Sequence, residues 1–176
     1  MAPKLHLIDY ESENPIILRN DGTFDFFNMI KKLSEDEIRT ELFLNKIIDI
    51  YNIDKSKKYL IVVRIAENKI KIQEKLKERL KINIGVLNFN KPNLNYNNED
   101  IVLTSLCVYD LYQTSKLNFM YTFNTFCILD YVGAFGIIDN FVENFNIPEL
   151  IYMRDINKPF KHKNLDMIRY KNYDLI

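Results

Sequence analysis

The spacing of apolar and polar residues predicts strands and helices in mixed order. Short runs of β-branched and aromatic residues are typical of strands, and Tyr59–Ile65 is so apolar that it is expected near the middle of a sheet. The turn signal Asn20-Asp21-Gly22 directly follows the predicted strand Pro15–Arg19. The predicted strands are Lys4–Tyr10, Pro15–Arg19, Tyr59–Ile65, Ile82–Phe89, Ile101–Tyr112, Leu117–Tyr131 and Glu149–Met153.

Apolar residues that recur every three or four positions predict helices that bury one face. Ser34 and Glu37 have the spacing of a capping box, which predicts a helix over residues 35–51, and Asn68 is expected to cap a second helix over 69–81. Residues 24–33 and 135–145 are also predicted to be helical. The expected buried positions are Ile38, Leu42, Ile47 and Ile50 in the first helix, and Ile72, Leu76 and Leu80 in the second.

These elements predict a mixed α/β (α+β) fold. A strand, helix and strand over residues 59–89 have the length of a parallel crossover, whereas 101–112 and 117–131 are expected to form an antiparallel hairpin through residues 113–116. We therefore expect a single domain over residues 1–153, with a central sheet of about six strands and packed helices. Residues 154–176 lose the periodic pattern and are expected to form an extended C-terminal docking tail.

Composition is that of a globular domain: the chain of 176 residues is 47% hydrophobic and 27% charged. Ile, Asn and Lys are abundant, and their AT-rich codons point to an AT-rich genome. The N-terminus lacks the apolar segment of a signal peptide, and no apolar run approaches the roughly 20 residues of a membrane span. A cytoplasmic location and no membrane partner are therefore expected.

Candidate catalytic and metal-binding residues are few. Zinc sites need several converging His, Cys or carboxylate ligands, but the chain has His6 and His162 far apart and no CxxC motif. Cys107 and Cys127 lie in apolar runs and are expected to be buried, reduced thiols. The sequence thus predicts no metal, no cofactor and no catalytic residue, and the protein is interpreted as a non-enzyme.

The charges are unevenly distributed although the formal net charge is zero. Residues 1–54 carry a net charge of −5, residues 55–91 +8, residues 92–152 −6 and residues 153–176 +3. Such asymmetry indicates the kind of partner and not the fold. The two basic blocks are a predicted helix and the C-terminal tail, where basic residues alternate with aromatic ones, a composition that suits contacts with RNA.

The sequence therefore predicts a binding or regulatory factor that docks on a large partner, first of all RNA in a ribosome or another ribonucleoprotein. The predicted contact residues are Lys71, Lys75, Arg79, Arg154, Lys158, Phe160, Lys161, Lys163, Arg169, Tyr170 and Lys171. Two alternatives remain open: a viral or phage inhibitor of a host protein, and a degenerate enzyme. Residues 102–121 resemble a strand region of archaemetzincins, but the HExxH motif of that family is absent from the sequence.

Overall fold

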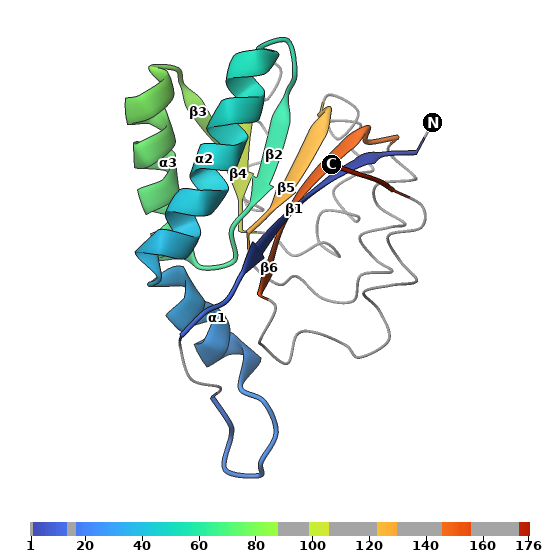
Figure 1. Cartoon of the computed structure of the whole chain (residues 1–176). Coiled ribbons are helices and arrows are strands. Elements are labelled where there is room, and N and C mark those ends of the chain that lie inside the picture. The colour runs from blue at the N-terminus through green and yellow to red at the C-terminus, as the bar shows by residue number, and fades with distance from the viewer. Residues whose placement is uncertain (1, 14–16, 88–98, 106–122, 130–145, 156–172) are drawn as a thin grey trace.

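A computed structural model describes residues 2–13, 17–87, 99–105, 123–129, 146–155 and 173–176. It confirms a mixed α/β fold, with helices packed on a parallel sheet (Figure 1). The described helices are α1 (Phe26–Ser34), α2 (Glu37–Ile53) and α3 (Ala66–Leu80). The described strands are β1 (Lys4–Tyr10), β2 (Tyr59–Val62), β3 (Ile84–Leu87), β4 (Ile101–Thr104), β5 (Thr125–Ile128), β6 (Glu149–Asp155) and β7 (Asp174–Leu175).

The described strands form one sheet in the order β3-β4-β2-β5-β6-β1-β7, and all neighbouring strands in it are parallel. The predicted crossover is confirmed, because β2 and β3 both run parallel to β4, which lies between them. The predicted antiparallel hairpin is wrong in its described parts. Strands β4 and β5 do not pair with each other but flank β2, each parallel to it. Consecutive parallel strands of one sheet need a crossover connection of about a dozen residues or more, and 20 residues separate β4 from β5.

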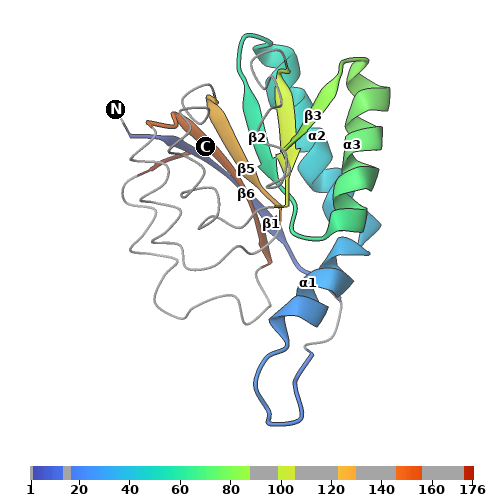
Figure 2. The same ribbon diagram turned by 180° about the vertical axis from the view of Figure 1, so that it is seen from behind.

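Helices α2 and α3 cover the same face of the sheet, as the views from both sides show (Figures 1 and 2). Their amino ends lie at the carboxyl edge of the sheet, the edge where the parallel strands end, because each helix runs back against the strands. Helix α1 lies beyond this edge (Figure 1). Among the described residues, no helix is long and apolar enough to cross a membrane.

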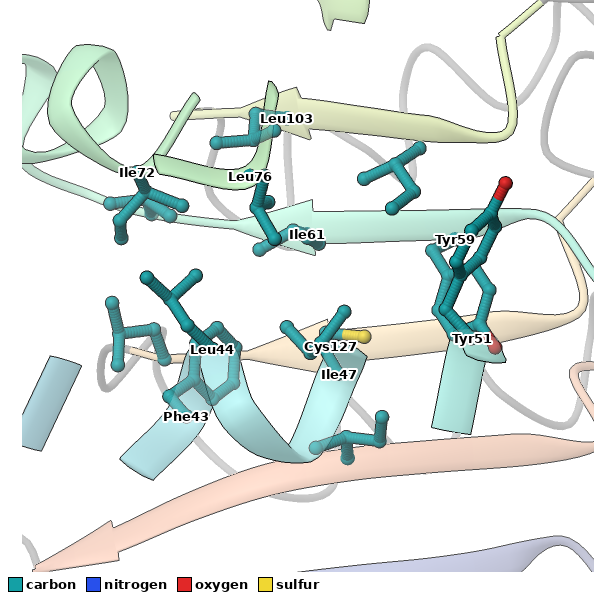
Figure 3. Packing of buried hydrophobic residues seen from close by; sticks show 14 of the residues in the cluster. Phe43, Leu44, Ile47, Tyr51, Tyr59, Ile61, Ile72, Leu76, Leu103 and Cys127 are labelled. Atoms are coloured by element: carbon teal, nitrogen blue, oxygen red, sulfur yellow. The ribbon is translucent and has the colours of Figure 1, made fainter. Parts of the chain in front are cut away.

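The core lies between this helical layer and the sheet. Residues Phe43, Leu44 and Ile47 of α2 point towards β2 and β5 (Figure 3), and all three are fully buried. Ile61 and Val63, in the segment that the sequence predicted near the middle of the sheet, are both inaccessible. All of β2 is buried, which is why its sequence shows no alternation of polar and apolar residues.

Two details of α2 correct the prediction from sequence. Asp36, not Ser34, caps the helix: its carboxylate accepts a hydrogen bond from the Arg39 amide at 3.1 Å, whereas the Ser34 hydroxyl donates to the Lys31 carbonyl at 2.6 Å in α1. The predicted buried face is also partly wrong, because Ile38 is 68% exposed and Leu42 41% exposed. The face that packs on the sheet includes Arg39, Thr40, Phe43, Leu44, Ile47, Ile50 and Tyr51.

The segment around residue 20 is a turn with little strand structure. Among the described residues of the predicted strand 15–19, pairing is limited to an isolated antiparallel bridge between Leu18 and Phe24. Gly22 has a φ of +81°, a left-handed conformation that glycine adopts without strain. The predicted turn at residues 20–22 is therefore confirmed.

Both ends of the predicted C-terminal tail belong to the sheet. Strand β6 continues to Asp155, and β7 pairs with β1 from Asp174. Tyr173 is buried next to β7. The residues between 155 and 173, with the predicted contacts at 158, 160, 161, 163 and 169–171, lie outside the described part of the chain, so their docking role stays a prediction.

Candidate functional site

The predicted basic row of α3 faces the acidic side of α2. Lys71 pairs with Glu37, and Lys75 lies 3.1 Å from Glu37 and 2.5 Å from Glu41. Arg79 pairs with Glu41 and donates a hydrogen bond to Asn45 at 3.2 Å. These contacts join the two helices side by side. The structure thus gives Lys71, Lys75 and Arg79 partners inside the domain, and their contact with another molecule remains untested.

Glu41 is at the centre of this row. Hydrogen bonds from Lys75 and then Arg79 lower the pKa of Glu41 below its ordinary value. The stabilisation that follows is present above the ordinary pKa and is lost as the pH falls through the lowered one.

We expect Glu41→Gln to lower the free energy of unfolding at pH 7 by about 0.5–1 kcal/mol, because partly exposed ion pairs are screened by solvent. Urea denaturation at pH 7 and pH 3 measures the effect, and the difference from the unmutated protein should shrink at the lower pH. A loss that stays the same at both pH values would contradict the assigned ion pairs.

Other lysines are exposed at the end of α3 and in the turn before β2. Lys77 and Lys81 lie one turn apart on a different face of α3 from Lys71, Lys75 and Arg79. Lys55 is exposed in the turn that follows α2. None of these three has an ion pair within the described residues. A neighbouring open hollow, lined by Lys77, Lys81, Ile82, Asn83, Glu99 and Asp100, is balanced in charge and does not itself favour an anion.

Arg154 is the described member of the predicted tail contacts. It lies in β6 and holds the carboxylate of Asp9 on β1 with two hydrogen bonds of 2.6 and 2.9 Å. The two residues are paired in the register of these strands. Arg154 therefore has a partner within the sheet.

A buried charged cluster lies at the amino edge of the sheet, where the parallel strands begin. Glu149, the first residue of β6, lies 2.5 Å from His6 Nε2 on β1 and 2.8 Å from Lys57 Nζ in the turn before β2. The hydroxyl of Thr125 on β5 lies 3.4 Å from the same carboxylate. We call these four residues the amino-edge cluster. It joins β1, β5 and β6 to the turn that leads into the central strand.

The electrostatics of the amino-edge cluster stabilise the ionised form of Glu149. The hydrogen bond with His6, together with that from Lys57, lowers the pKa of Glu149 to about 2 despite burial. Burial, and then the negative charge of Glu149, raises the pKa of Cys127, which keeps its thiol neutral. The prediction of a buried free thiol is confirmed for Cys127, whereas Cys107 lies outside the described residues.

Sequence reasoning did not single out Glu149 or Lys57. His6 and Glu149 are 143 positions apart, so no local pattern could bring them together. The sequence does show a glutamate as the first residue of an apolar strand. This pattern indicates a paired carboxylate, since a buried carboxylate needs a partner. The cluster has the contacts of a structural ion-pair network.

The carboxyl edge of the sheet has polar side chains that are almost fully buried. Arg39 donates a hydrogen bond to the Leu129 carbonyl at 2.6 Å, just beyond β5. Lys69 lies 3.3 Å from the hydroxyl of Ser105, just beyond β4, and burial lowers the pKa of Lys69. Asn68 is 4% exposed, and neither the nitrogen nor the oxygen of its side-chain amide has a hydrogen-bond partner among the described residues. The prediction that Asn68 caps α3 is wrong, because the helix begins at Ala66 and its cap position is Ile65.

The comparisons with known proteins do not place the chain in a family. No family model matches the sequence, and no curated protein is significantly similar to it. The function must therefore be inferred from the residues themselves.

Proposed function

We propose that this protein is a non-enzymatic binding factor that docks on a ribosome or another ribonucleoprotein. The contact would be made by the exposed lysines of α3 and by the basic, aromatic segment 154–176. A ribonucleoprotein offers phosphate groups and protein surface together, which suits a partner surface of lysines and aromatic residues.

The observation that supports this proposal is the division of the basic residues of α3 into two sets. The first set is Lys71, Lys75 and Arg79, which make ion pairs or hydrogen bonds with acidic or amide side chains of α2. Lys77 and Lys81 are exposed and have no ion pair within the described residues. We therefore assign the proposed contact on α3 to Lys77 and Lys81 and not to the paired row. Lys55 lies at the same end of the domain and would add to this contact.

The proposal predicts binding to RNA that weakens with salt. Each phosphate contact adds about one unit to the slope of log affinity against log salt concentration, so Lys77→Glu and Lys81→Glu should each flatten this slope by roughly one unit. Fluorescence anisotropy with ribosomal RNA fragments at several salt concentrations measures it. Lys31→Glu, an exposed lysine of α1 at the other edge of the sheet, is the matched control and should leave the slope unchanged.

Co-purification from the source cells, with and without RNase, tests the partner itself. Association that is lost with RNase and weakened by Lys77→Glu supports the proposal. Association that persists after RNase treatment and is unchanged in Lys77→Glu contradicts the proposal. It would point to a protein target, as for an inhibitor of a host protein. Tail contacts should be tested by Phe160→Ala and Lys161→Ala and not by deletion, because both ends of the segment lie in the sheet.

A further inference from the structure

The amino end of α3 lies at the place where parallel sheets usually bind ligands. Ligands of such sheets bind beyond the carboxyl ends of the strands, where the strand order reverses. Here β2 and β5 are neighbours, but the chain continues from them in opposite directions across the sheet. The strand that follows β2 in sequence, β3, lies beyond β4, whereas the next described strand after β5, β6, lies on the far side of β5. Helix α3 follows β2 after the three residues Val63–Ile65, so its first turn lies at this point of reversal.

The first turn of α3 lacks a side-chain cap. Its cap position is the apolar Ile65, and the described residues include no side chain that caps the helix by a hydrogen bond. The hydrogen bond from the Lys69 amide to the Ile65 carbonyl, at 2.9 Å, starts the helical ladder. Free amides and the helix dipole make such an end favourable for an anion.

Asn68 is the independent observation that points to a ligand. It is 4% exposed, and within the described part of the chain neither its amide nitrogen nor its amide oxygen has a hydrogen-bond partner. Burying an unpaired amide is unfavourable, so a group of this kind calls for an explanation. Asn68 lies on the same side of α3 as the buried Ile72 and Leu76, and helical side chains tilt towards the amino end. Its amide is therefore directed towards the first turn and the strand ends.

Lys69 and Ser105 add donors of the right kind next to Asn68. Lys69 is 8% exposed, and its ammonium group lies 3.3 Å from the Ser105 hydroxyl, directly after β4. Strands β2 and β4 are held together there by the hydrogen bond from the Val63 amide to the Thr104 carbonyl at 2.8 Å. An ammonium, an amide NH₂, a hydroxyl and main-chain amides are all donors.

We infer that the first turn of α3, with Asn68, Lys69 and Ser105, binds the phosphate group of a small molecule. A tetrahedral phosphate presents several acceptor oxygens around one centre, which matches donors that come from a helix end, two residues of that helix and a neighbouring strand. This site is distinct from the exposed lysines Lys77 and Lys81, which lie at the opposite end of α3.

The test is calorimetric titration with inorganic phosphate and, separately, with a nucleoside monophosphate. The unmutated protein should bind at least one of the two probes saturably. Asn68→Leu should weaken that binding about tenfold or more, because a hydrogen bond to a charged group is lost. Tighter binding of inorganic phosphate identifies the free ion as the ligand, and tighter binding of the nucleotide identifies a phosphate ester.

Stability measurements separate a binding role from a structural one. Asn68→Leu removes an unpaired amide while keeping similar volume, so the melting temperature without phosphate should stay the same or rise. Asn52→Leu, at an exposed position of α2, is the matched control and should bind the probe as the unmutated protein does. No saturable binding of either probe, or equal affinity in the Asn68→Leu variant, overturns the inference. RNA binding that is unchanged in Asn68→Leu and weakened in Lys77→Glu shows that the phosphate site and the ribonucleoprotein contact are tested independently of each other.

Discussion

Replacing Glu149 by alanine is expected to lower the free energy of unfolding at pH 7 by about 3–5 kcal/mol, because it leaves the half-buried Lys57 without its counter-charge and the buried His6 without its hydrogen-bond partner. Glu149 is 5% exposed and contacts His6 and Lys57 at 2.5 and 2.8 Å. The loss should be large because these contacts connect β6 to β1 and to the turn that leads into β2. Chemical denaturation followed by circular dichroism measures it.

The same variant should show a specific dependence on pH. The pKa of Glu149 falls from 4.5 to about 2 on folding, so its contribution is fully present above pH 4.5 and is lost as the pH falls towards 2. The difference in stability between the unmutated protein and Glu149→Ala should therefore shrink between pH 5 and pH 2 (about 1.4 kcal/mol for each unit of pKa shift).

An exposed glutamate provides the control for Glu149. Glu35 makes an ion pair with Lys32 at 3.1 Å, and both side chains are 54% exposed. Glu35→Ala should change the free energy of unfolding by less than about 1 kcal/mol. Equal effects of the two substitutions would show that the amino-edge cluster does not contribute as the structure implies.

Local patterns predicted the elements well where one periodicity dominated. The strand Lys4–Tyr10 is found with the predicted limits, and Ile72 and Leu76 of α3 are buried as their spacing predicted. The fully apolar segment that became β2 was also placed correctly near the middle of the sheet. These features depend on side chains within a few positions of one another, which a single sequence displays directly.

Pairing between distant segments could not be predicted in the same way. The order of the parallel strands depends on which crossover packs against which face, and β2 takes its neighbours from residues 101–104 and 125–128. Two consecutive apolar runs suggested a hairpin because nearby strands often pair. Both instead pair with β2, one along each of its edges, because a strand in the middle of a parallel sheet has a hydrogen-bonded neighbour on each side.

The candidate sites depended on long-range contacts in the same way. In the sequence the basic row of α3 looks like a free phosphate-binding surface, because the acidic residues of α2 that pair with it lie 34 positions away. Asn68 has the residue type of a helix cap, but α3 begins three residues earlier than predicted, so its side chain is buried and unpaired among the described residues. A shift of this size changes the role of a residue without changing the predicted helix.

The orientation of α2 gives the last prediction. Ile47→Ala should lower the free energy of unfolding by about 2–4 kcal/mol, because the side chain is completely buried against β2 and β5 and its removal leaves a cavity. Ile38→Ala is the matched control: the same atoms are removed from the same helix, but this side chain is 68% exposed. Alanine has the better helix propensity, so Ile38→Ala should be neutral or stabilising by a few tenths of a kcal/mol. Thermal and urea denaturation of the two variants compare the positions directly. Similar losses at both positions would restore the buried face expected from the sequence, whereas a loss confined to Ile47 supports the face seen in the structure.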